Sequence, residues 1–204
     1  MKKFLMIAVM AMSALSMSAQ DSKFAAGVNF DFATFKGYTA PGFGIKLQYN
    51  FTEALRAELG YTYYLNSKLD AAWLGDEPKD GIWTINLNFA YMFKVSDKVK
   101  IGPMAGIAMV STHMNDAAKG VYAAEAALIN QAFGTNLDNV KNTMAFGFQI
   151  GAAADFQVSD HFKVGVDAYY KHAKKDYKFT DGNNYKPGMD LNGFVLSATA
   201  AYCF

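Results

Sequence analysis

From residue 26 onward, apolar and polar residues alternate along most of the chain. Segment 43–51 reads FGIKLQYNF, for example, and every second residue in it is apolar. This period of two is typical of a β-strand whose two faces meet different surroundings. The chain is therefore predicted to be all-β, with eight strands near residues 27–34, 43–51, 55–63, 83–93, 99–109, 144–156, 162–170 and 194–204.

The two faces of these strands differ in a way that indicates which one points inward. The apolar face carries no Asp, Glu, Lys or Arg in any of the eight segments, whereas the polar face holds the charges and nearly all the strand glycines. A soluble sandwich or lipocalin would bury its apolar face and expose its polar face to water. An outer-membrane barrel does the reverse, and small inward residues let a narrow barrel close. The second arrangement fits better.

Short and long connections also alternate along the chain. Short polar turns are expected at Thr52-Glu53, Ser96-Asp97 and Ser159-Asp160, and longer connections at 36–42, 65–82, 113–143 and 173–190. Short turns on one rim and long loops on the other are typical of an antiparallel up-and-down transmembrane β-barrel. The short turns and both mature termini are then expected to be periplasmic.

The first residues form a targeting segment. Lys2 and Lys3 precede an apolar run from Leu5 to Leu15, and small residues follow up to Ala19. A transmembrane helix needs about 20 apolar residues, so the run is too short to span a bilayer. Residues 1–19 are predicted to be a signal peptide, followed by an outer-membrane β-barrel domain at 20–204.

Composition excludes several classes of function. The chain has 19 basic and 18 acidic side chains, a balance that argues against binding nucleic acid. Its single cysteine, Cys203, rules out an intramolecular disulfide framework and a cysteine-cluster metal site. The three histidines have no spacing that joins them into a metal site. No cofactor and no metal are expected.

Together, the signal peptide, the alternating strands and the terminal Tyr202-Cys203-Phe204 resemble the eight-stranded outer-membrane β-barrel family of Gram-negative bacteria, in particular the OmpA/OmpX-like barrels of Bacteroidota. The resemblance implies that the protein lies in the cell outer membrane, in contact with its lipid. It also implies that Tyr202 and Phe204 belong to a signal read by the barrel-assembly machinery. The family has no shared catalytic motif, so the resemblance implies no enzymatic activity.

Three functions are compatible with this reading. The first is a structural or interaction role, with extracellular loops contacting envelope or external partners. The second is a narrow, porin-like channel for small solutes. Both depend on a network of inward-facing charged residues, which either fills the lumen or lines a path through it: Asp31, Lys46, Arg56, Glu58, Lys100, Asp155, Lys163, Asp167 and Lys171.

The third function is a lipid A-modifying enzyme that uses Ser111 and His113 on the outer rim, with serine as nucleophile and histidine as base. Lipid A deacylases that resemble this arrangement have the histidine before the serine and a glutamate that orients it, and this chain has neither feature. We therefore expect Ser111 and His113 to be polar rim residues at a strand end and not catalytic residues.

Two loops carry candidate contact surfaces. Residues 121–133 are rich in alanine and contain no proline, which favours a helix that forms either a lid on the barrel mouth or a surface for an external partner. Loop 173–190 places lysines among aromatic residues; it is either an ordinary exposed, solvated loop or a surface that binds anionic lipopolysaccharide or glycans.

Overall fold

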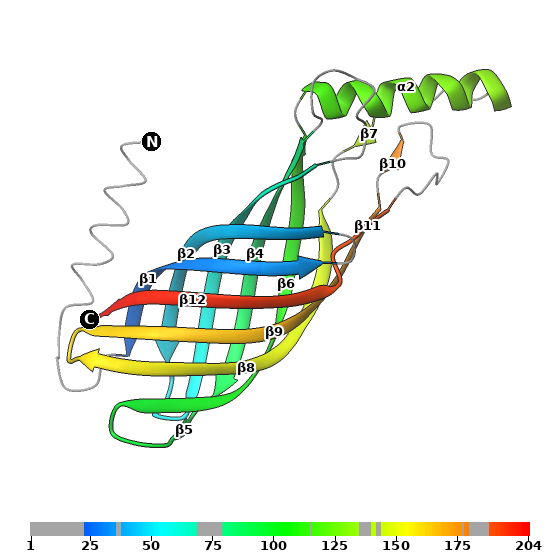
Figure 1. Ribbon diagram of the computed structural model, residues 1–204. Helices are drawn as coiled ribbons and strands as arrows, with labels where there is room; N and C mark the ends of the chain where they lie inside the picture. Colours follow the sequence, from blue (N-terminus) through cyan, green and yellow to red (C-terminus); the bar gives the residue numbers. More distant parts are fainter. Residues whose placement is uncertain are drawn as a thin grey trace.

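The computed structural model describes residues 23–35, 38–68, 79–114, 116–134, 140–141, 144–176, 178–179 and 188–204. Eight long antiparallel strands in these ranges form a closed barrel (Figure 1): β1 (Phe24–Phe35), β2 (Tyr38–Asn50), β3 (Leu55–Lys68), β4 (Lys79–Tyr91), β6 (Val99–Met114), β8 (Ala145–Ser159), β9 (Phe162–Asp176) and β12 (Gly193–Cys203). The predicted all-β antiparallel barrel is confirmed. The predicted signal peptide lies outside the described residues.

Barrel closure depends on the pairing of the first and last strands. β1 pairs with β12 over eleven residue pairs, from Ala25–Cys203 to Phe35–Gly193. The other neighbours in the barrel follow one another in sequence, as expected for an up-and-down topology. Small inward residues permit this close packing: a Cβ atom on Gly44 would collide with the backbone carbonyl of Tyr61 on the neighbouring strand.

The outer wall of the barrel is apolar. Outward side chains such as Val28, Phe146 and Ile150 are each exposed over more than half of their surface. Aromatic residues pair near both ends of the wall: Tyr49 with Phe51 near one end, and Tyr170 with Phe194 near the other. An apolar band between two aromatic girdles is the surface of a membrane-spanning barrel.

The two ends of the barrel differ. At the short-turn end, the connections 51–54, 95–98 and 160–161 join neighbouring strands, and the Phe204 N–H donates a 3.0 Å hydrogen bond to the Phe24 carbonyl. The opposite, long-loop end carries α2 (Asp116–Phe133) and three short strands, β7 (Val140–Lys141), β10 (Lys178–Phe179) and β11 (Gly188–Asp190) (Figure 1). The helix predicted at 121–133 is confirmed and begins five residues earlier. No helix among the described residues is long and apolar enough to cross a membrane.

Several boundaries differ from the sequence-based prediction. Four strands extend into the expected long connections: β3 ends at Lys68, β4 begins at Lys79, β6 ends at Met114 and β9 ends at Asp176. The connection expected at 36–42 is shorter, because Tyr38–Pro41 continue β2 and pair with β1. The strand expected at 83–93 is interrupted at Met92, whose N–H donates to the Ala54 carbonyl at 2.6 Å. Pairing with β6 resumes in the short strand β5 (Phe93–Lys94).

Candidate functional site

The centre of the lumen holds a network of buried ion pairs. Lys46 Nζ lies 2.5 Å from Asp167 Oδ2 and 3.3 Å from Glu58 Oε1. Arg56 reaches three carboxylates: Nη1 is 2.6 Å from Asp155 Oδ2, and Nη2 is 3.4 Å from Glu58 Oε2 and 3.6 Å from Asp167 Oδ1. These five residues come from β2, β3, β8 and β9, so the network ties opposite sides of the barrel together.

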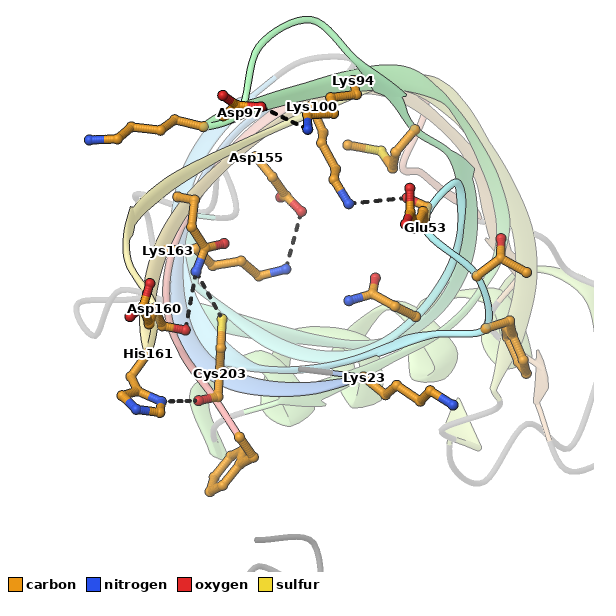
Figure 2. Close-up of a pocket in the computed structure, with 17 residues that line it drawn as sticks. Lys23, Glu53, Lys94, Asp97, Lys100, Asp155, Asp160, His161, Lys163 and Cys203 are labelled. Carbon is orange, nitrogen blue, oxygen red and sulfur yellow. Dashed lines mark hydrogen bonds and ion pairs between the residues drawn. The ribbon is translucent and has the colours of Figure 1, made fainter. Parts of the chain in front are cut away.

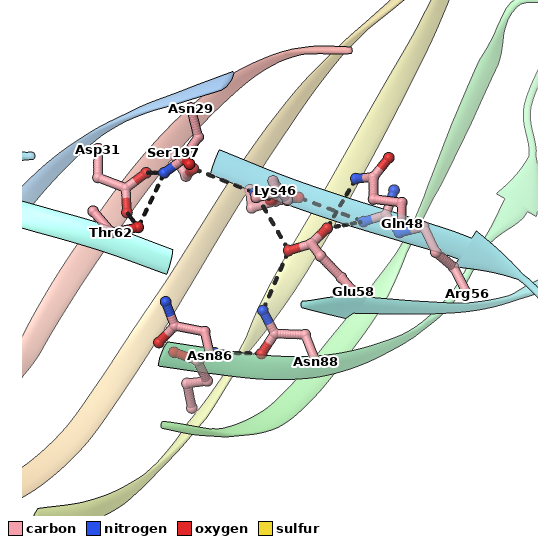
Figure 3. A network of polar contacts seen from close by, with 12 residues as sticks. Asn29, Asp31, Lys46, Gln48, Arg56, Glu58, Thr62, Asn86, Asn88 and Ser197 are labelled. Atoms are coloured by element: carbon pink, nitrogen blue, oxygen red, sulfur yellow. Dashed lines mark hydrogen bonds and ion pairs between the residues drawn. The ribbon is translucent and has the colours of Figure 1, made fainter. Parts of the chain in front are cut away.

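Neutral amides complete the hydrogen bonding of Glu58 (Figure 3). Gln48 Nε2 donates to Glu58 Oε2 at 2.9 Å, and Asn88 Nδ2 donates to Glu58 Oε1 at 3.3 Å. Gln149 in turn donates to the side-chain carbonyl of Asn88. A buried carboxylate is tolerated only where cations and donors replace its lost hydration, and Glu58 has both.

A second polar layer lies toward the long-loop end. Asp31 accepts hydrogen bonds from Asn29 at 2.7 Å, from Thr62 at 3.2 Å and from the Tyr64 hydroxyl at 3.1 Å. Lys171 donates to Asn86 Oδ1 at 3.2 Å. Asp31 and Lys171 therefore contact neutral groups rather than each other.

An apolar layer fills the lumen beyond these polar layers. The Lys171 ammonium lies 5.5 Å from the Tyr64 ring centre and 5.7 Å from that of Tyr169, which is a cation–π arrangement. Above them, the inward side chains are apolar and buried: Phe35, Ile82, Val110, Leu191 and Val195. The sequence reasoning missed this layer, because it took the inward face to be polar along its whole length.

The nine predicted lumen residues thus occupy different depths. Asp31, Lys46, Arg56, Glu58, Lys163, Asp167 and Lys171 are buried in the interior, and Asp155 is largely buried. Lys100 is not part of the network and lies at the mouth of the short-turn end, where its Nζ donates to the Glu53 carbonyl at 3.2 Å. Among the eight interior residues, four cations balance four carboxylates.

A cavity of about 530 Å³ opens at the short-turn end (Figure 2). Lys163 and Asp155 lie in it with their charged atoms 3.1 Å apart. Met92 and Cys203 give it an apolar wall, and Lys94 of β5 and the turn residue Asp97 lie at its edge. The hydrogen bond from Lys94 lowers the pKa of the exposed Asp97 carboxyl below its usual value.

The remaining sequence candidates occupy separate places. Ser111, predicted to lie on the open outer rim, is buried, so its hydroxyl is not presented on the outer wall; the side chain of His113 lies outside the described ones. His161 stacks on Tyr202 in the short-turn rim, with ring centres 5.6 Å apart. Within the described residues, no group of His, Cys, Asp and Glu side chains could hold a metal ion.

The fold and the sequence match known barrels. A family model described as outer membrane protein beta-barrel domain matches residues 4–204. Neisserial surface protein A is 16% identical, with a TM-score of 0.52, over 89% of this chain and 96% of its own. The outer membrane protein OprG from Pseudomonas aeruginosa is 10% identical, with a TM-score of 0.59, over 89% of this chain and 95% of its own. At these identities the likeness concerns the fold alone. No curated protein matches the sequence.

Proposed function

The chain belongs to the outer membrane protein β-barrel domain family, and on that premise we propose that it is an anchored structural or interaction protein of the outer membrane. The barrel wall holds it in the lipid. Its long-loop end contacts envelope or external partners, including lipopolysaccharide. The function requires neither a cofactor nor catalysis.

The observation that carries this proposal is the filled lumen. The ion-pair network centred on Arg56 crosses the barrel, and the side chains of Arg56, Tyr64 and Lys171 are almost completely buried. A solute path would need continuous polar space from one end to the other. The apolar layer around Ile82 and Leu191 lies in the lumen and would interrupt such a path. These features favour an anchor over a channel.

A bilayer experiment tests this choice. The purified protein inserted in planar lipid bilayers is expected to show no stepwise conductance, because buried ion pairs and the apolar layer occupy the lumen of the described part of the barrel. A general-diffusion porin inserted in parallel serves as the positive control. Regular conductance steps that scale with the amount of inserted protein would favour the porin-like alternative.

The contact surface is proposed to lie at the long-loop end. Two large apolar side chains of α2, Leu128 and Phe133, are exposed over 66% and 78% of their surface. Apolar side chains that are exposed at the loop end favour contact with an external partner over contact with water. Of the lysines in 173–190, Lys174, Lys175 and Lys178 lie in strands that the structure describes, and Lys174 is exposed. A lipid A-modifying activity would appear as altered lipid A mass spectra in cells that make the protein, and none is expected.

The proposed topology places the short-turn end and both mature termini in the periplasm. Protease added to intact cells is then expected to cut within 65–82, 113–143 or 173–190. It should spare the turns at Ser96-Asp97 and Ser159-Asp160, which become accessible only after the outer membrane is permeabilised. Mass spectrometry of the released fragments identifies the cut sites. Cleavage confined to the short turns of intact cells would invert the orientation.

Assembly is proposed to depend on the last residues of β12. Changing Tyr202 and Phe204 to Ser is expected to lower the amount of folded, heat-modifiable protein in the outer membrane, since the family's assembly signal resembles this terminal pattern. The Phe204 ring also packs on Phe24, with ring centres 5.6 Å apart. The assay compares boiled and unboiled outer-membrane fractions on a gel.

A matched control distinguishes the loss of an assembly signal from the general effect of removing an aromatic side chain from the apolar wall. Phe194→Ser removes an exposed aromatic from the other end of the same strand and is expected to assemble better than the double variant. Normal yield and a normal heat shift for the double variant would show that this end carries no assembly information.

A further inference from the structure

The inner surface of the cavity at the short-turn end is net positive, because Lys100 and Lys163 lie there with one lining carboxylate, that of Asp155, while Lys23 and Lys98 are exposed at the rim. Five lysines and four carboxylates line it. Asp97 is paired with Lys94 at 2.8 Å, and both side chains are exposed on the rim. Glu53 and Asp160 also sit in exposed turns. The carboxylate deep in the cavity is that of Asp155, and its Oδ2 is already shared by Arg56 and Lys163, at 2.6 and 3.1 Å.

Lys100 adds a further cation to this inner surface. It lies on the inward face of β6, and Figure 2 shows its side chain and that of Lys163 reaching into the mouth of the barrel. The Lys100 ammonium donates to the Glu53 backbone carbonyl at 3.2 Å. It has no carboxylate within ion-pair distance among the residues that the structure describes. An ammonium has three donors, so two remain for a bound group.

We propose that this cavity binds a small organic anion, with a carboxylate or phosphate group held by Lys100 at the mouth and Lys163 on the floor. A volume of about 530 Å³ lies within the range of about 300–1,000 Å³ found for small-molecule sites. Met92 and Cys203 give the cavity an apolar wall for the body of such a ligand. This inference goes beyond the proposed function, because an anchoring barrel needs no ligand.

The test uses the purified barrel in phosphatidylcholine nanodiscs, with ¹³C-labelled methionine methyl groups. Met92 lines the cavity, whereas Met144 is exposed near the long-loop end and serves as the internal reference. Inorganic phosphate and succinate are titrated separately. The Met92 methyl resonance is expected to shift and to saturate with at least one of them, while the Met144 resonance stays in place. The anion that saturates identifies phosphate or carboxylate as the preferred group.

Three variants make the result specific. Lys100→Gln is expected to weaken binding at least tenfold, since it removes a charge-assisted contact, and Lys100→Arg is expected to retain it. Lys174→Gln makes the same change on an exposed β9 residue outside the cavity and should bind normally. The experiment is independent of the orientation of the barrel in the cell. Failure of both anions to saturate the Met92 shift, or equal saturation in Lys100→Gln, would overturn the proposal.

Discussion

Replacing Arg56 with methionine is expected to lower the free energy of unfolding of the barrel by about 3–5 kcal/mol, the usual cost of removing one partner from a buried ion pair. Methionine fills much of the same volume, so the loss is electrostatic rather than a cavity effect. Without the guanidinium, Glu58, Asp155 and Asp167 keep only Lys46 and Lys163 as cationic partners. The measurement is reversible urea unfolding in lipid vesicles, followed by tryptophan fluorescence.

A control and a second variant show whether the network acts as a unit. Lys94→Met breaks the exposed pair with Asp97 and is expected to leave the unfolding midpoint unchanged, because solvent and salt screen such a pair. Adding Glu58→Gln to Arg56→Met should cost less than the sum of the single changes, since the partners are in contact. An Arg56→Met barrel as stable as the natural one would indicate a hydrated lumen and would revive the channel hypothesis.

The strands and the direction of their faces could be predicted because both follow from local geometry. Successive side chains of a strand point to opposite faces, so a run such as 43–51 assigns each residue to the wall or the lumen without knowledge of its neighbours. Excluding charge from one face then identifies that face as the one in lipid. The same rule placed Lys46 and Asp167 on the inward face.

Which inward residues contact one another could not be predicted in the same way. Lys46 and Asp167 are 121 positions apart, and their contact depends on the stagger between β2 and β9, which β1 and β12 separate. The interruption at Met92, which helps to shape the cavity, depends on a hydrogen bond to the Ala54 carbonyl. Neither feature leaves a local pattern in the sequence.

The apolar layer near the long-loop end did leave a signal. Tyr63-Tyr64, Ile82-Trp83 and Phe194-Val195 are adjacent apolar residues close to the loop end of their strands. In each pair the alternation fails, because Tyr64, Ile82 and Val195 point inward and are buried while their neighbours belong to the outer wall. Adjacent apolar residues near a strand end therefore indicate an apolar plug in this barrel.

The lipid face can be tested at a single wall position. Ile150 lies midway along β8, with Ala105 on β6 and Tyr170 on β9 as its register partners, and 60% of its surface is exposed. Ile150→Arg is expected to cost about 2–4 kcal/mol, because an arginine at the midplane of the bilayer loses its hydration. The preceding residue, Gln149, faces the lumen instead, where its side chain is buried and hydrogen-bonded to Asn88.

Depth within the membrane is what distinguishes this cost from a general effect of charge on the wall. Val158 is an exposed apolar residue near the short-turn rim of the same strand, where an arginine reaches water and Val158→Arg should cost only about 0–1 kcal/mol. Both variants are unfolded in urea in vesicles of the same lipid, and the two losses of free energy are compared. Equal losses at the two positions would mean that the cost does not depend on depth, and the assignment of this apolar wall to lipid would then have to be abandoned.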